Sequence, residues 1–243
     1  MGVRTGLNLL AAPLRPMLLS VLCILLLAPA LAQSGQPSDA KATKSDDAIH
    51  HDRVVPKTPA DYHPITAEGR LRWFVRSTVG PKTLVGGVIS AGYGTAANHP
   101  HEYGTHWEGF GQRYGMRLTG VSTGNAMEAG LGAVWGEDPR YFHTVHQSLG
   151  GRAKNVVDLT FRAYHRDGER HPAYARYIAT FGNNFLSNTW RVHSEADWRH
   201  AMLRSGEGFG ARCVSNAVSE FVPQLWRKVR RKPDPYPADL RLP

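Results

Sequence analysis

The sequence predicts a mainly α-helical domain, a compact bundle of about five to seven helices, and three observations support this class. Apolar residues recur with the period of a helix over most of the chain after residue 64. Alternating strand patterns are scarce. Glycine, alanine and serine recur four positions apart, which places small side chains on one stripe of a helix. We therefore expect Gly/Ala-rich helix packing to hold the domain together.

The first 32 residues have the pattern of a signal peptide. Arg4 and Arg15 supply positive charge, the apolar run 17–27 is too short to span a bilayer comfortably, and the small residues at 30–32 form a cleavage site. We expect export, with a periplasmic or outer-membrane-associated protein as the product. Cleavage would remove Cys23 and leave Cys213, which excludes an internal disulfide in the mature chain.

Composition divides the remainder into three parts. Residues 33–63 are polar and contain few large apolar side chains, so we expect a flexible leader. Residues 64–232 carry the helical periodicity and form the predicted domain. Residues 233–243 are rich in proline and are expected to be an extended tail.

The first predicted helix begins at Thr66, a suitable N-cap, and runs to Val79. Five of its residues share one face and are expected to pack on the core of the domain: Leu71, Phe74, Val75, Thr78 and Val79. Arginines occupy much of the remaining surface. The same helix is therefore also a basic amphipathic helix of the kind that lies on an anionic membrane.

The middle of the chain predicts three further helices. Pro81 opens one over 82–97, and two others follow over 107–118 and 119–135. In the last of these, Gly120 and Gly124 are four apart. Interior glycine costs up to about 1 kcal/mol relative to alanine, so close helix packing must compensate.

The second half predicts helices over 152–165, 173–190 and 195–221, with Pro223 bending or ending the last one. A turn is expected at 167–168. A capping box starting at Ser194 would open the last helix. The stripe expected to be buried in the helix over 173–190 consists of Tyr174, Ile178, Phe181, Phe185 and Thr189.

A cluster of histidines and carboxylates is the densest set of metal-ligand side chains in the sequence. His99, His101 and His106 are the candidate ligands, with Glu108 as a candidate catalytic carboxylate. Zinc takes imidazole and carboxylate ligands, and a catalytic site needs three of them and an open position. The spacing between the last two histidines is one residue longer than in HExxH, so only a loop-borne zinc site fits. Histidines that fill polar loop positions are the simpler interpretation.

Glu128 is the second candidate catalytic residue. It lies between apolar and small neighbours, so its carboxylate is expected to be buried and to need a partner. Arg113 or Arg117 is the expected ion-pair partner, and an acid/base role in a cleft is the functional alternative. No nucleophile elbow, phosphate-binding loop, dinucleotide-binding motif or haem-attachment motif is present.

Three segments resemble exported bacterial proteins of unknown function: RLRWFVRSTVGP (70–81), the glycine-rich stretch 106–142 and FGNNFLSNTW (181–190). The resemblance covers most of residues 64–226. It implies export and a shared fold, and it carries no activity, cofactor or site residue.

The charge balance completes the functional expectation. The formal net charge is +9, and loss of Arg4 and Arg15 with the signal peptide would lower it to +7. For an exported chain this points to anionic lipid or envelope polymer rather than to nucleic acid, although solubility alone also accounts for it. We expect a non-enzymatic envelope protein that associates with the membrane surface or with envelope components. The alternative is a metal-assisted hydrolase of an envelope lipid or polymer that uses residues 99–108.

Overall fold

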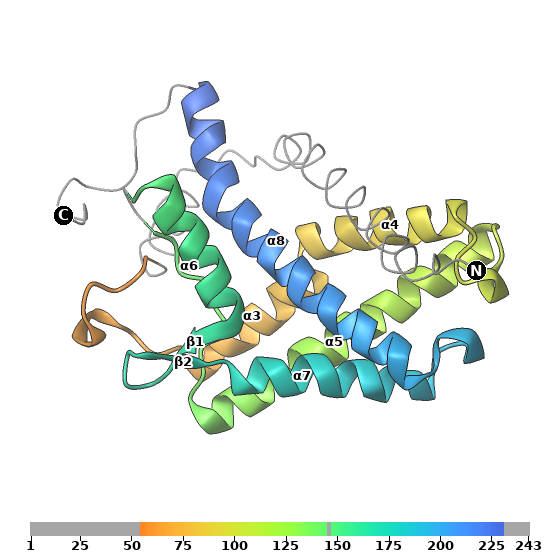
Figure 1. Cartoon of the computed structure of the whole chain (residues 1–243), viewed down its shortest axis with the longest axis horizontal. Coiled ribbons are helices and arrows are strands. Elements are labelled where there is room, and N and C mark those ends of the chain that lie inside the picture. The colour runs from red at the N-terminus through yellow and green to blue at the C-terminus, as the bar shows by residue number, and fades with distance from the viewer. Residues whose placement is uncertain (1–53, 145–146, 231–243) are drawn as a thin grey trace, which may run out of the picture. The chain divides into compact units, whose positions relative to one another are not determined.

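One long helix, α5 (Trp107–Trp135), packs extensively against α3 (Ala67–Val79), α4 (Pro81–Ala96) and α7 (Tyr174–Leu186). The computed structural model describes residues 54–144 and 147–230, and these residues are mainly α-helical, which confirms the predicted fold class. The other helices are α6 (Leu149–Phe161) and α8 (Trp198–Arg230) (Figure 1). Helix α8 packs against α6 and α7.

The predicted signal peptide, most of the leader and the tail at 233–243 lie outside the described residues. Residues 54–63, which were assigned to the leader, contribute to the fold. Val54 forms a bridge with His143, and the short 3-10 helix η1 (Pro59–Asp61) precedes the buried Tyr62. Tyr62 packs with three other buried residues in a small apolar core: Phe142, Leu159 and Tyr164. The ordered fold therefore begins before residue 64.

Local hydrogen bonds account for where the helices start. Thr66 accepts from the amide of Gly69, as predicted, and Pro81 occupies the first turn of α4. Helix α6 begins earlier than expected, because Ser148 caps it by accepting from Gly151. Asp197, rather than Ser194, caps α8, since its carboxylate accepts from the amide of His200 at 2.7 Å.

Three predicted boundaries are wrong. The two helices expected over 107–135 are one helix, because no breaking residue separates them, and α5 ends at Gly136 in the left-handed conformation (φ 78°). The last helix does not stop at residue 221, since α8 continues through Pro223 to Arg230. The helix expected over 152–165 stops at Phe161 and gives way to a short hairpin.

That hairpin pairs β1 (Arg162–Tyr164) with β2 (Arg170–Pro172) in an antiparallel register in which Ala163 faces His171. Its turn contains Gly168, which has a φ of 78°. A Cβ atom there would lie 2.4 Å from the carbonyl oxygen of Pro59, so the turn also needs glycine for this close approach. Strands of three residues are too short to show a period of two in the sequence.

Small residues mediate the contact between α5 and α7. A Cβ atom added at Gly124 would lie 3.2 Å from the side-chain nitrogen of Asn183 on α7, and one at Gly120 would lie 4.0 Å from the same atom. A Cβ atom at Gly130, in contrast, would meet nothing within 4 Å. The glycines of α5 are therefore close-packed against α7 at Gly124, whereas Gly130 faces open space.

Gly124→Leu should lower the free energy of unfolding by about 1–3 kcal/mol, because the larger side chain forces α7 away from α5. Gly130→Ala should raise it by roughly 0.5–1 kcal/mol through helix propensity alone. Urea unfolding followed by circular dichroism measures both changes. Equal effects at the two glycines would contradict the assigned packing.

The predicted buried faces of α3 and α7 are largely wrong. On α3, Thr78 is buried and Phe74 is half-buried, but Leu71, Val75 and Val79 are 62%, 45% and 50% exposed. All five residues expected inside in the helix over 173–190 are exposed: Tyr174, Ile178, Phe181 and Phe185 on α7, and Thr189 in the 3-10 helix that follows it. The buried face of α7 consists instead of Ala175, Arg176 and Ala179.

Candidate functional site

The loop between α4 and α5 carries the predicted metal ligands. Arg113 of α5 holds this loop by donating to the carbonyl oxygens of His99, Pro100 and Gly104 at 3.0, 2.7 and 2.7 Å. Those bonds use the backbone of the loop and leave the imidazole rings outside the contact. Arg113 is thereby engaged with carbonyl oxygens rather than with Glu128, which was one of its expected partners.

The candidate histidines themselves are exposed. The rings of His99 and His101 are 6.4 Å apart between centroids, and Nε2 of His99 lies 3.9 Å from a carboxylate oxygen of Glu195, which belongs to the 3-10 helix η4 (His193–Glu195). His106 occupies the N-cap position of α5. In the part of the chain that the structure describes, these histidines are not among the groups of three side chains close enough to share a metal ion. Zinc binding by His99, His101 and His106 stays a prediction.

Glu108 lies in the first turn of α5 and is exposed to solvent. Its carboxylate accepts from the side-chain amide of Gln112 at 3.5 Å, one turn further along the same helix. An acidic residue in the first turn favours the helix through its dipole. The position supplies a helix-stabilising charge, and a catalytic role of Glu108 remains untested.

Glu128 is buried as predicted, at 5% exposure, but its partners differ from the expected ones. Oε1 accepts from Nε of Arg176 on α7 at 3.0 Å, and Oε2 accepts from Nη2 of Arg212 on α8. The expected ion pair with Arg113 or Arg117 is therefore wrong. The cations that meet Glu128 come from α7 and α8, and the local sequence around Glu128 gives no indication of them.

The surroundings of Glu128 make it a structural anchor. Arg176 is 2% exposed and donates also to the carbonyl oxygens of Leu159 and Thr160. Burial lowers the pKa of Arg212 to about 10, and the Glu128 carboxylate opposes that shift. Both carboxylate oxygens are committed to guanidinium groups, so protonation of Glu128 would leave buried cations without a counter-charge. The acid/base role proposed for Glu128 stays a prediction.

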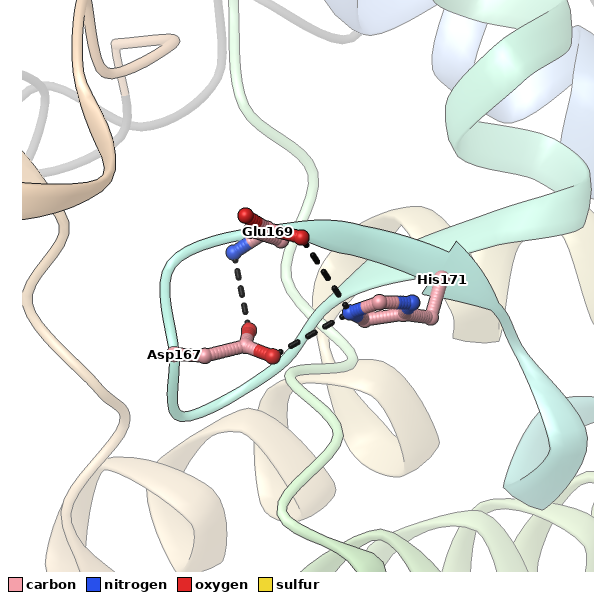
Figure 2. Close-up of side chains that lie close together, drawn as sticks. All are labelled: Asp167, Glu169 and His171. Atoms are coloured by element: carbon pink, nitrogen blue, oxygen red, sulfur yellow. Dashed lines mark hydrogen bonds and ion pairs between the residues drawn. The ribbon is translucent and has the colours of Figure 1, made fainter.

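A third group of ionisable side chains lies at the tip of the hairpin (Figure 2). Nε2 of His171 is 3.1 Å from Asp167 and 3.8 Å from Glu169, and Asp167 accepts from the amide of Glu169 at 2.9 Å. That amide and the His171 ring lower the pKa of Asp167. In the described residues this is the group whose ligand atoms are mutually close enough for a metal ion. The hydrogen bond and ion pairs among these three residues explain the cluster as a turn stabilised by its own side chains.

A groove of about 530 Å³ lies between α3 and α5. Leu71 and Phe74 of α3 line one side, and the small residues Ala126 and Gly130 of α5 line the other. Small side chains on α5 leave this space open, since a Cβ atom at Gly130 would have no neighbour within 4 Å. The volume lies within the range of about 300–1,000 Å³ that is typical of ligand pockets.

Two arginines join the lining of this groove. Arg70 of α3 donates to the carbonyl oxygens of Ala129 and Glu137 at 3.4 and 2.8 Å, and Arg166 of the hairpin donates to that of Ala133 at 2.9 Å. Both guanidinium groups thus compensate carbonyl oxygens near the C-terminal end of α5, where cations are favourable. Burial lowers the pKa of Arg70.

Within the described residues, neither arginine has a carboxylate at ion-pair distance. The nearest acid to influence Arg70 is Asp138, whose carboxylate is bound by Arg140 and by the hydroxyl of Tyr62. The groove thus combines apolar walls with two guanidinium groups that make no ion pair with an acidic side chain among the described residues.

Sequence reasoning missed this groove. Arg70 was assigned to a helix surface and Arg166 to no site, and the two are separated by almost a hundred positions. The sequence feature that could have indicated it is the row of small residues on α5. These residues were expected only to let helices pack closely.

Comparison with known proteins adds no identification. No protein-family model, no curated protein and no solved structure matches this chain.

Proposed function

We propose that this chain is an exported envelope protein that binds the surface of an anionic membrane through α3. The observation that carries the proposal is the exposed stripe of that helix, which we call the α3 stripe: Leu71, Val75 and Val79. These residues repeat every four positions and thus share one face, while most aliphatic side chains on a helix of a folded domain would be covered.

Exposed cations accompany the α3 stripe. Arg72 and Arg76 lie on the same helix and are exposed. The ion pair between Arg72 and Glu68 is also exposed, so it contributes little. A helix with an apolar stripe and adjacent arginines can place the former among acyl chains and the latter among anionic headgroups. The predicted signal peptide and the net charge of +9 agree with such a location.

A second exposed apolar surface exists on α7, but it lacks this charge pattern. Tyr174, Ile178 and Phe181 are exposed there, whereas the arginine of that helix, Arg176, is buried against Glu128. Among the described residues, no helix is long and apolar enough to cross a membrane. Of these two exposed surfaces, the one on α3 therefore better fits binding to an anionic membrane.

The expected affinity is modest and reversible. Burying the exposed half of each residue of the α3 stripe contributes about 1 kcal/mol, and each arginine close to an anionic surface contributes about 1 kcal/mol. Together these contributions give a binding free energy of about 5 kcal/mol. One charge added to the α3 stripe is sufficient to disrupt binding of this strength.

Flotation with vesicles tests the proposal. The protein should float with phosphatidylglycerol vesicles at about 0.01 M salt, and it should float much less at about 1 M salt or with phosphatidylcholine alone. Val75→Glu should lower vesicle binding about tenfold or more, since each tenfold change corresponds to about 1.4 kcal/mol.

Val157→Glu is the matched control. Val157 lies on α6 and is 51% exposed, close to the exposure of the α3 valines, but α6 packs against α8 and not against α3. It should bind vesicles like the unmodified protein. A protein that never floats, or one in which both substitutions act equally, would refute the assignment to α3.

A further inference from the structure

We infer that the groove between α3 and α5 binds a long-chain fatty acid, with its acyl chain along the apolar walls and its carboxylate at Arg70 and Arg166. This goes beyond membrane association, because it assigns a site for a single dissolved ligand. The inference depends on three features of the groove: its walls, its open space and its charge.

The walls fit an unbranched acyl chain. Leu71 and Phe74 offer apolar contact from α3, and the opposite side includes the methyl group of Ala126 and the helix backbone at Gly130. A flat surface of small residues favours a slender ligand over a bulky ring system. Each methylene group removed from water contributes about 0.8 kcal/mol, so a long chain provides most of the affinity.

The charge favours a carboxylate over a neutral head. Arg70 uses Nη1 and Nη2 for carbonyl oxygens, and Arg166 uses Nη2, which leaves N–H groups on both guanidinium planes for another acceptor. Hydrogen bonds between a guanidinium and a carboxylate are among the strongest in proteins. A fatty acid also supplies a carboxylate in direct contact with these arginines, which no side chain of the described residues does.

The geometry also suggests how the ligand enters. Leu71 lines the groove and is at the same time the most exposed residue of the α3 stripe. The open side of the groove thus lies next to the surface proposed to face the membrane. A fatty acid leaving a lipid layer would meet this opening without crossing the folded domain.

Displacement of a fluorescent fatty acid such as cis-parinaric acid tests the inference, with all ligands below their micelle-forming concentrations and no vesicles present. Palmitate should displace the probe, and hexadecanol, which has the same chain length and no charge, should do so at least tenfold less effectively. Because membranes are absent, this result does not depend on whether α3 binds vesicles, and each proposal can fail separately.

Gly130→Leu is the decisive variant, because its side chain projects into open space and fills the groove. It should weaken palmitate binding at least tenfold. Gly111→Leu is its matched control: Gly111 is another glycine of α5 with no neighbour within 4 Å of an added Cβ atom, and it does not line the groove. This control should change palmitate binding less than twofold.

Arg166→Gln tests the charge separately. It should weaken palmitate about tenfold and leave the binding of hexadecanol unchanged, whereas a purely structural role would weaken both ligands alike. Arg72→Gln, which removes an exposed arginine of α3 outside the groove, should affect neither ligand.

Several results would overturn the inference. Absence of displacement by palmitate, equal displacement by palmitate and hexadecanol, or unchanged binding in a folded Gly130→Leu variant would each do so. The inference would also be overturned if Gly130→Leu changed the oligomeric state measured by sedimentation and still bound palmitate. The groove would then be a contact with a second copy of the chain.

Discussion

Replacing Arg176 by methionine should lower the free energy of unfolding by about 3–5 kcal/mol, because it leaves a buried carboxylate with one partner instead of two. Glu128 would keep only Arg212, and the carbonyl oxygens of Leu159 and Thr160 would lose their donor. Methionine retains most of the side-chain volume, so the loss reports on charge and hydrogen bonding rather than on a cavity. Urea unfolding followed by circular dichroism measures it.

Arg72→Met is the matched control. Arg72 and its partner Glu68 are both exposed, and such pairs contribute about 0–1 kcal/mol. The double variant Glu128→Met with Arg176→Met should be less destabilised than the sum of the two single variants, because it removes both the charge and its partner. A loss below about 1 kcal/mol in Arg176→Met would contradict the anchoring role of this ion pair.

Glu220→Gln should lower the free energy of unfolding by about 3 kcal/mol at neutral pH. The Glu220 carboxylate is buried and binds Nε of Arg152 at 3.2 Å, the hydroxyl of Tyr141 at 2.9 Å and the amide of Thr144 at 3.2 Å. Arg152 is itself 6% exposed and would remain without a counter-charge. The exposed Glu68→Gln is the control and should cost less than about 1 kcal/mol.

The loss of unfolding free energy in Glu220→Gln should depend on pH, and the pKa of Glu220 sets the sign of this dependence. Burial acts to raise the pKa of Glu220, but hydrogen bonds from His143, Thr144, Tyr141 and Arg152 outweigh it and hold the pKa below the ordinary value of 4.5. The unfolded state therefore takes up the proton first as the pH falls. The stabilisation is complete above that ordinary value and is lost as the pH decreases through the folded pKa. The difference in unfolding free energy between the unmodified protein and Glu220→Gln should shrink below about pH 4.5. A difference that grows on acidification would contradict this.

The helical class could be predicted because periodicity and capping are local. Thr66, Pro81 and Gly136 act within one or two turns of their own position, and the structure places helix ends at all three. The hairpin after α6 could not be predicted, because its three-residue strands depend on pairing with each other and on the close approach of Gly168 to Pro59.

The orientation of helices was harder to predict than their existence. On α7 the period of the large apolar residues is helical, and the rule that such a stripe faces inward is nonetheless wrong for this helix. Arg176 takes the inner position, because Glu128 provides a buried partner there, and Ala175 and Ala179 beside it allow the close approach. The spacing of Ala175, Ala179 and Asn183 was the sequence signal for that face.

The candidate sites show the same limitation. That Glu128 is buried follows from its apolar neighbours, but its partners come from α7 and α8, which no local pattern identifies. The groove brings together Arg70 and Arg166 only because the hairpin packs near the C-terminal end of α5. Contacts of this kind, between distant segments, can be identified only from the folded structure.

The most direct test of membrane binding is the environment of α3 when lipid is added. An environment-sensitive fluorophore attached at Val75→Cys, in a protein without other cysteines, should shift to shorter wavelength and gain intensity with phosphatidylglycerol vesicles. The same label at Val157→Cys on α6, a position of similar exposure, should not respond. A response at Val157→Cys with none at Val75→Cys, or no response at either position, would contradict the proposal that α3 is the membrane-binding surface.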